Sequence, residues 1–315
     1  MKKILVTGGS AVAGDGLKSV VKKGEYPGYE FIFPTSKNLN LLDFESTKKF
    51  VSDWKPDAII HYAAISGGLQ LTQNYPASIM RDNIMMNYNI VESARLTNRS
   101  KVLLTLSAAC YPLGTSVPMK EEDFHKGFPH EANYSYAFSK RLIDPMIKSY
   151  RKEYGMDLVG IISGAIIGPR SNFNPKSSTA LPGIIRRFYE NKEGNSQIIV
   201  WGDGSPVRQF TSDEDVGRIS MWFIENYSDS KILNISTPEE TSIKDAAYMI
   251  AEFMGIDSNR LKFDTTKLNG AQSQSLDSSK FLSLSGFNYI KSRDAIKRAV
   301  DYFVENYPNT DKLRL

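Results

Sequence analysis

The stretch Lys3-Ile-Leu-Val-Thr7-Gly8-Gly9-Ser10-Ala11-Val12-Ala13-Gly14 indicates how the chain begins to fold. Its first five residues form a short apolar and β-branched run, typical of a buried strand, and helical spacing follows the glycines from Leu17 to Lys23. Glycines between a first strand and a first helix let the backbone approach a pyrophosphate, which rests on the helix N-terminus. The stretch therefore predicts dinucleotide binding, although Ala11 replaces a middle glycine and a merely structural turn is the alternative. The residues expected around the cofactor are Gly8, Ser10, Ala11, Val12, Ala13 and Gly14.

Strand-like and helix-like segments alternate through the first half of the chain. Apolar, β-branched runs follow at 30–33, 58–61, 101–106 and 158–162, and helical spacing occurs at 46–54, 83–96 and 135–154. Strands that alternate with helical segments are typical of a parallel sheet with helices on both faces. We therefore expect the α/β class, with a Rossmann-type, doubly wound parallel sheet.

The composition of the chain changes after Gly168. Residues 169–182 are rich in Ser, Asn and Pro, and helical patterns resume at 181–191, 212–227, 242–254 and 292–306. Ligands of open α/β sheets bind outside the carboxyl ends of the strands, where a second lobe can cover them. We expect an NADP(H)-binding Rossmann domain at 1–168, completed by part of 209–235. Residues 169–315 would mainly form a smaller C-terminal substrate-binding lobe; the alternative is a continuation of the same domain.

Composition excludes several classes of protein. The 315 residues are 41% hydrophobic and 23% charged, which fits a soluble globular chain rather than a disordered one. No apolar run approaches the roughly 18 residues that a membrane helix needs. A single cysteine and three scattered histidines disfavour a disulfide framework and a metal site. The net charge of +4 is not gathered in a basic block, which disfavours nucleic acid as a partner. We expect a cytoplasmic protein without a membrane, metal or nucleic-acid partner.

The end of the second predicted strand bears on the choice of cofactor. An NAD enzyme usually presents Asp or Glu there to the ribose hydroxyls. Here the segment Pro34-Thr35-Ser36-Lys37 offers hydroxyls and a cation, and no acid. We therefore expect Ser36 and Lys37 to bind a 2′-phosphate, so that the cofactor is NADPH. The alternative is that Lys37 is an ordinary solvated lysine.

Tyr136 and Lys140 form a candidate catalytic pair. Their i, i+4 spacing places a phenol and an ammonium on one helix face. A neighbouring ammonium stabilises phenolate and lowers the tyrosine pKa, and such a tyrosine can donate a proton to a carbonyl oxygen. The spacing is common by chance, but Ser107 ends the preceding strand and can hydrogen-bond the same carbonyl. We therefore predict that Ser107, Tyr136 and Lys140 are catalytic.

These residues resemble the extended short-chain dehydrogenase/reductase family. Over nearly the whole chain the closer resemblance is to the GDP-L-fucose synthases, the NADPH-dependent 3,5-epimerase/4-reductases of GDP-4-keto-6-deoxymannose. Besides the glycine turn and the catalytic trio, it rests on these segments: His61-Tyr-Ala-Ala64, Gly168-Pro169, Leu181-Pro-Gly-Ile-Ile-Arg-Arg187, Val200-Trp-Gly-Asp-Gly204, Arg208-Gln-Phe210 and Phe263-Asp-Thr-Thr-Lys267.

The resemblance implies a reaction and a set of binding residues. NADPH would deliver hydride to C4 of a GDP-linked 4-keto sugar, Tyr136 would protonate O4, and Ser107 would orient the ketone. Lys140 would tune Tyr136 and hold the nicotinamide ribose. A homodimer formed through the helices near 83–96 and 135–154 is also implied. Further cofactor contacts are expected at Ala63, Ala64, Asn83, Ser163, Ala165 and Ile166, and substrate contacts at Asn172, Arg187, Trp201 and Arg208.

The chain departs from the family at the two epimerase positions. The family has a Cys two residues after the catalytic Ser and a His before Leu-Pro, where this chain has Ala109 and Thr179. Neither side chain exchanges a proton near neutral pH. Cys110 lies one residue too late, and on an extended segment it would point to the opposite face. We therefore expect a reductase without 3,5-epimerase activity, in the synthesis of a GDP-sugar for surface polysaccharide.

The sugar pocket also departs from the family. The stretch at 163–165 and the pair Arg170-Ser171 differ from it, and Gln274 stands where the family has a basic residue. These changes favour a heptose or a similar sugar, while the 6-deoxyhexose of the family stays open. Arg170 would either touch that sugar or face water.

Three other functions stay open. A bifunctional epimerase/reductase would need His125 or His130 as its acid and base. A 4,6-dehydratase would need an acidic pair after Ser107, and residues 108–110 supply none. A non-catalytic NADP(H)-binding regulator is disfavoured because the catalytic trio is intact.

Overall fold

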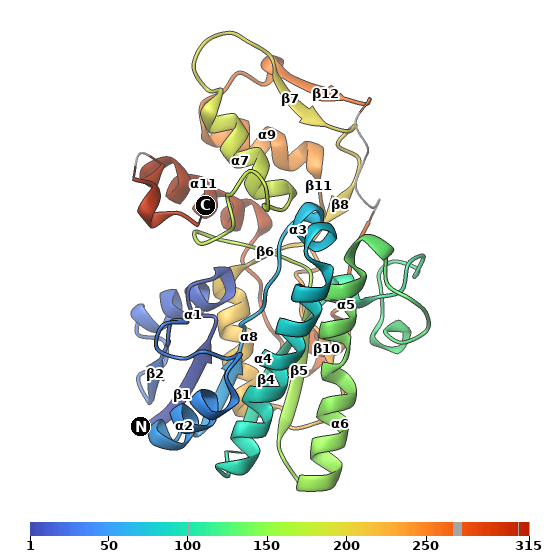
Figure 1. Cartoon of the computed structure of the whole chain (residues 1–315). Helices are drawn as coiled ribbons and strands as arrows, with labels where there is room; N and C mark the ends of the chain where they lie inside the picture. Colours follow the sequence, from blue (N-terminus) through green and yellow to red (C-terminus); the bar gives the residue numbers. More distant parts are fainter. Residues whose placement is uncertain (100, 267–272, 308, 315) are drawn as a thin grey trace.

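The computed structural model describes residues 1–99, 101–266, 273–307 and 309–314 (Figure 1). Six parallel strands form a central sheet in the order β10-β5-β4-β3-β1-β2. This order, with strands added on either side of β1, confirms the doubly wound α/β fold. The strands are β1 (Lys2–Thr7), β2 (Tyr29–Ile32), β3 (Ala58–His61), β4 (Lys101–Ser107), β5 (Leu158–Ser163) and β10 (Leu233–Asn234).

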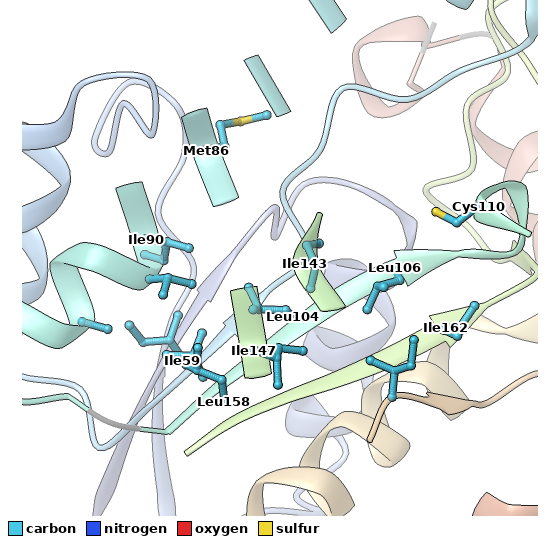
Figure 2. Packing of buried hydrophobic residues seen from close by; sticks show 14 of the residues in the cluster. Ile59, Met86, Ile90, Leu104, Leu106, Cys110, Ile143, Ile147, Leu158 and Ile162 are labelled. Atoms are coloured by element: carbon cyan, nitrogen blue, oxygen red, sulfur yellow. The ribbon is translucent and has the colours of Figure 1, made fainter. Parts of the chain in front are cut away.

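Helices cover both faces of the sheet, because the strand residues that point to either face are apolar. Along β1, Leu5 packs in one cluster, whereas Ile4 and Val6 pack in the other. Figure 2 shows the first cluster, where Ile143 and Ile147 lie close to Leu104 and Leu158. On that face lie α2 (Phe44–Trp54), α4 (Pro76–Leu96) and α6 (Ile143–Tyr154); on the other lie α1 (Val12–Lys22) and α8 (Asp213–Asn226).

Two helices differ from the sequence prediction. The single helix expected at 135–154 is two helices, α5 (Tyr134–Arg141) and α6, with Leu142 between them. Pro145 has no N–H to donate to the carbonyl of Arg141, so a continuous helix loses a hydrogen bond there. The helix expected from residue 83 begins at Pro76, whose fixed φ suits a first helical position. A short helix, α3 (Leu69–Asn74), precedes it.

A second lobe, at the top of Figure 1, contains α7 (Ala180–Glu190), α9 (Ile243–Phe253) and α11 (Ser292–Asn306). It has its own apolar core. Phe188, Ile250 and Phe303 come from its three helices and are fully buried together. Three pairs of short strands complete the described part of this lobe, and four of these strands have only two or three residues, too few to show a period-2 pattern. The strands are β6 (Ala165–Ile167), β7 (Ile198–Trp201), β8 (Val207–Arg208), β9 (Phe210–Ser212), β11 (Thr241–Ser242) and β12 (Leu261–Asp264).

The chain passes between the two cores more than once. After β9 it returns to the sheet, where α8 packs on α1 and β10 pairs with β5. Phe281 of α10 (Ser279–Ser285) packs with the same sheet-side cluster, and α11 then rejoins the second lobe. None of the helices that the structure describes is long and apolar enough to cross a membrane.

Candidate active site

A cavity of about 390 Å³ lies at the carboxyl ends of β4 and β5. Ser107 and Ser163 line it from the sheet, and Leu181 and Arg208 line it from the second lobe. This is where an open α/β sheet is expected to bind its ligand. The cavity brings together twelve of the predicted site residues: Ala11, Val12, Ala13, Ala64, Ser107, Tyr136, Lys140, Ser163, Ala165, Ile166, Asn172 and Arg208.

The glycine-rich turn presents the start of α1 to this cavity. Gly8 has a φ of +73°, and a Cβ there would lie 2.6 Å from the backbone N of Ala63. A Cβ on Gly14 would lie 2.5 Å from the Cα of Gly9. These glycines therefore allow the turn to be tight, because any side chain there would clash with the backbone. Residues 11–13 line the cavity instead. The first N–H groups of a helix have no partner within it, and Ala11, the N-cap residue, has no side chain that could accept from them.

The predicted catalytic trio meets at the end of β4. Ser107 is the last residue of β4, and Tyr136 and Lys140 lie one turn apart on α5. Burial raises the pKa of Tyr136 above its ordinary value, and a side-chain hydrogen bond with Ser107 partly opposes this rise. Burial also lowers the pKa of Lys140 to about 8. Each shift disfavours a charged form that has been taken out of water.

The raised pKa of Tyr136 corrects one sequence expectation. We expected Lys140 to lower this pKa, but burial raises it, and the opposing contribution comes from Ser107. Tyr136 is therefore a neutral phenol near pH 7, the form that can donate a proton. The Nζ of Lys140 is buried without a described hydrogen-bond partner. An unpartnered buried ammonium beside an open helix N-terminus fits a dinucleotide, whose ribose hydroxyls and phosphates supply acceptors.

Two predicted contact residues use their side chains to hold loops. Asn83 is 1% exposed, and its Oδ1 accepts a hydrogen bond from the N–H of Ile65 at 2.9 Å. Its Nδ2 donates to the carbonyls of Ile65 at 3.0 Å and Ile79 at 2.9 Å. The Nδ2 of Asn172 likewise donates to the carbonyl and Oγ of Ser177, both at 3.0 Å. Asn83 therefore positions the loop after β3, part of which lines the cavity.

The residues predicted for a 2′-phosphate lie outside the described lining of the cavity. Ser36 and Lys37 are exposed in a turn after β2. The Oγ1 of Thr35 donates to Oδ1 of Asn38 at 2.7 Å across this turn. Their contact with a phosphate stays a prediction.

The residues predicted for the GDP half divide into two groups. Arg208 lines the cavity, and its Nη1 donates to the carbonyl of Val207 at 2.6 Å. Arg187 of α7 lies with its guanidinium 4.7 Å from the ring centre of Trp201 on β7, and this indole is 62% exposed. Arg187 and Trp201 thus lie together on the second lobe but do not belong to the described lining. Burial lowers the pKa of both arginines.

The two epimerase positions line the cavity with side chains that do not titrate. Ala109 and Thr179 both contribute to its wall. Cys110 lies in the apolar cluster instead, where Figure 2 shows it beyond Leu106, and its Sγ donates to the carbonyl of Ala137 at 3.4 Å. The segment is a 3₁₀ turn, η1 (Ala108–Cys110), rather than the extended segment we expected, yet it also directs Cys110 away from the cavity. Burial raises the pKa of the Cys110 thiol to about 11.

The three histidines are not among the described residues that line the cavity. His61 is buried between Thr7 and Asn87, and burial lowers its pKa to about 3. The Nε2 of His125 lies 2.8 Å from the Oδ2 of Asp144, and His130 accepts from the N–H of Ala132. Within the described ranges, no group of three His, Cys, Asp or Glu side chains could hold a metal ion.

Sequence reasoning missed several residues of the wall. Gln209 lines the cavity and exchanges two hydrogen bonds with the backbone of Leu276, at 2.8 and 3.1 Å. Arg314 also lines it, although no motif surrounds this residue. Arg170, which we considered as a sugar contact, donates to the carbonyl of Lys312 instead. Gln274 lies in the wall as a neutral residue, and Lys267 falls outside the described residues.

Comparison with known proteins identifies the family. The model of the NAD dependent epimerase/dehydratase family matches residues 4–236. GDP-L-fucose synthase of Dictyostelium discoideum is 32% identical over 314 residues, which cover 99% of this chain and 98% of the relative. The crystal structure of a GDP-L-fucose synthetase from Naegleria fowleri bound to NADP superposes with a TM-score of 0.92 at 31% identity, and covers 100% of this chain and 95% of that chain.

A second solved structure shares the fold at lower identity. It is MlghC, a GDP-mannoheptose C4 reductase from Campylobacter jejuni, with a TM-score of 0.85, 24% identity and coverage of 96% of this chain and 98% of its own. The family match and the full-length relatives confirm the resemblance drawn from the sequence. The chain therefore belongs to the NAD-dependent epimerase/dehydratase family and groups there with the GDP-L-fucose synthases.

Proposed function

We propose that this NADP-dependent oxidoreductase is a C4-ketoreductase of a GDP-linked 4-keto sugar and does not epimerise its substrate. One observation carries the proposal: the cavity holds Ser107, Tyr136 and Lys140 together, while Ala109 and Thr179 occupy the epimerase positions. No Asp, Glu, His or Cys is among the described residues of the cavity wall. Reduction needs one proton donor, whereas epimerisation needs both a base and an acid near the operating pH. In the described wall only Lys140 has a pKa in that range, at about 8, so a second such group is lacking.

The trio supplies the proton and the orientation for reduction. NADPH supplies a hydride to the carbonyl carbon when it is bound. Tyr136, neutral near pH 7, donates its phenolic proton to the ketone oxygen, and Ser107 holds that oxygen by a hydrogen bond. Lys140 compensates the charge that develops on Tyr136 and holds a ribose hydroxyl. The N-terminus of α1 binds the diphosphate of the cofactor, and Ser36 with Lys37 binds the 2′-phosphate.

The positively charged side chains in the cavity wall favour anionic ligands. Its described wall contains the cations Lys140, Arg208 and Arg314 and no carboxylate. Arg208 is suited to the diphosphate of a GDP-sugar, since a guanidinium binds phosphate oxygens through two N–H groups. Trp201 offers an exposed aromatic plane to the base, with Arg187 beside it. The substrate class we propose is therefore a GDP-sugar rather than a neutral sugar.

The sugar itself is proposed as a 6-deoxyhexose or a heptose. Ser163, Gly164 and Ala165 are small residues that line the cavity, so this part of the wall leaves room for a substituent. The product would be a GDP-activated sugar for a surface polysaccharide, made in the cytoplasm.

Exposed apolar side chains on two helices support a homodimer formed through these helices. They are Met85 and Tyr88 of α4 and Tyr154 of α6.

The decisive experiment is turnover with a panel of GDP-4-keto sugars. The panel contains 6-deoxyhexose and heptose forms, and NADPH oxidation is followed by its absorbance. We expect NADPH-dependent reduction at C4 of at least one sugar, with the C3 and C5 configurations retained in the product by NMR. A UDP-linked 4-keto sugar is the control for the base. Binding of NADPH without turnover of any of these ketones would contradict a reductase and favour a regulatory protein.

A further inference from the structure

The last described residues of the chain form part of the cavity wall. Arg314 lines the cavity and pairs with Asn172, and its carbonyl accepts from the N–H of Phe173 at 2.9 Å. Leu313, the preceding residue, is 6% exposed and belongs to the core of the second lobe. Packing and pairing thus fix the place of Arg314 relative to the cavity.

Arg170 and Tyr302 hold residues 312–314 in place by donating to one carbonyl, that of Lys312. Lys312 presents its carbonyl to Arg170 and to the hydroxyl of Tyr302, the latter at 2.9 Å. The side chain of Lys312 itself is exposed. Arg170, which we first considered as a contact to the sugar, is therefore an anchor of the segment that carries Arg314.

The guanidinium of Arg314 is half-buried, and the part of the chain that the structure describes gives it no opposing charge. Among the described residues it forms no ion pair, and the described wall around it holds no carboxylate. Burial is the main cause that lowers its pKa, and the positive charge of Arg170 adds to it. A half-buried cation beside a second cation is electrostatically unfavourable, so an anion in the cavity would stabilise it.

Arg314 and the start of α1 line the same cavity, and Arg170 links the two electrostatically. Arg170 also acts electrostatically on Asp15, which lies in the first turn of α1. Residues 11–13 of that turn line the same cavity as Arg314, and so does Lys140, whose Nζ has no described partner. A helix N-terminus and a guanidinium both bind phosphate oxygens, and two phosphates in one ligand can use both.

We infer that Arg314 binds a diphosphate in this cavity, so that the C-terminal segment is part of the ligand site. The inference rests on the proposed ligands, NADPH and a GDP-sugar, and both of them carry a diphosphate. Because Arg170 acts electrostatically on both Arg314 and Asp15 of α1, the cofactor is the favoured source.

The experiment compares three single variants of the full chain. Arg314→Gln removes the charge, Arg314→Lys keeps it without the guanidinium fork, and Lys312→Gln removes a neighbouring exposed charge while keeping the anchoring carbonyl. The dissociation constant of NADPH is measured by fluorescence titration and that of GDP by calorimetry, at one ionic strength. Thermal unfolding without ligand shows whether each variant is folded.

We expect Arg314→Gln to weaken one of the two ligands about 10-fold or more, the range for one charge-assisted hydrogen bond. Arg314→Lys should recover part of the affinity, since an ammonium binds phosphate as a point charge, and Lys312→Gln should bind as the unmodified protein does. Loss of NADPH affinity alone identifies the cofactor diphosphate, and loss of GDP affinity alone identifies that of the substrate.

Two results would overturn the inference while the proposed function stands: unchanged affinity of Arg314→Gln for both ligands, or an equal loss in Lys312→Gln. If the unmodified protein binds neither ligand, the proposed function and the inference are both wrong.

Discussion

Tyr136 and Lys140 show how burial competes with pairing at the scale of single residues. Pairing alone would lower the tyrosine pKa and raise the lysine pKa. The structure gives the opposite directions, with the pKa of Lys140 at about 8, because burial disfavours the charged form of each group. Near pH 7 the phenol of Tyr136 thus keeps its proton, and Lys140 is charged in most of the molecules. A reductase needs this combination, since the proton leaves Tyr136 only when charge develops on the ketone oxygen.

Replacing Tyr136 by Phe tests this assignment. We expect turnover of the GDP-4-keto sugar to fall by about 10²–10⁴-fold, the usual value of general acid catalysis. NADPH affinity should stay nearly unchanged, because only a hydroxyl is removed. Tyr134→Phe is the matched control, since Tyr134 lies on the same helix and is 44% exposed. Steady-state kinetics and NADPH titration check both variants, and a Tyr136→Phe enzyme with most of its activity would exclude Tyr136 as the donor.

The sequence was sufficient to predict that Ser107, Tyr136 and Lys140 meet in one site, because each has a recognisable place; their catalytic role stays a prediction. Ser107 ends a strand, and Tyr136 and Lys140 share a helix face by spacing alone. The roles of Asn83 and Asn172 could not be predicted in this way, since their amides bind backbone groups in loops whose path depends on the folded chain. Arg314 belongs to no motif of the sequence, and only the tertiary structure places it in the wall of the cavity.

At the scale of elements, strand and helix positions followed from periodicity, but only some of their ends did. The strand at 58–61 and the helix at 292–306 have the predicted bounds. The break at Leu142 depends on one missing N–H, that of Pro145, inside an otherwise helical pattern. Four of the six described strands of the second lobe have only two or three residues, which is too short for periodicity to detect.

The contact between α4 and the loop after β3 provides a prediction at this scale. Asn83→Ala leaves the N–H and carbonyl of Ile65 without their side-chain partner, which we expect to cost about 1–3 kcal/mol in the free energy of unfolding. NADPH affinity should also fall, because Ala64 and Ser66 of this loop line the cavity. Denaturant unfolding and NADPH fluorescence titration measure the two effects.

Asn89→Ala is the matched control on the same helix. Asn89 is 4% exposed, and its Nδ2 donates to the carbonyl of Leu41 at 2.8 Å, in a loop that is not part of the described cavity wall. It should lose stability and keep its NADPH affinity. Equal NADPH affinities for the Asn83 variant and the unmodified protein would show that the loop keeps its shape without this contact.

At the scale of the whole molecule, the cavity is built by segments far apart in the sequence. The sheet contributes Ser107 and Ser163, and the second lobe contributes Arg208 and Arg314. Periodicity predicts the two sheet strands, but neither the short strand that carries Arg208 nor the pairing of Arg314 with Asn172 across the lobe. The set of titratable groups around the ligand is therefore determined by the folded chain rather than by any one segment. Here the described wall contains phenols and cations, and no carboxylate, imidazole or thiol.

This composition of the wall predicts that the protein reduces without epimerising. Inverting C3 or C5 requires removal of a carbon-bound proton and return of another from the opposite face, by groups that titrate near the operating pH. We therefore expect no protein-dependent deuterium at C3 or C5 when a GDP-4-keto sugar is incubated with the protein in D₂O without NADPH and followed by NMR. The sugar in buffer gives the background, and a GDP-L-fucose synthase serves as the positive control. Incorporation above the background at either carbon would show that a base reaches the sugar, and the changes at Ala109 and Thr179 would then not have removed epimerase activity.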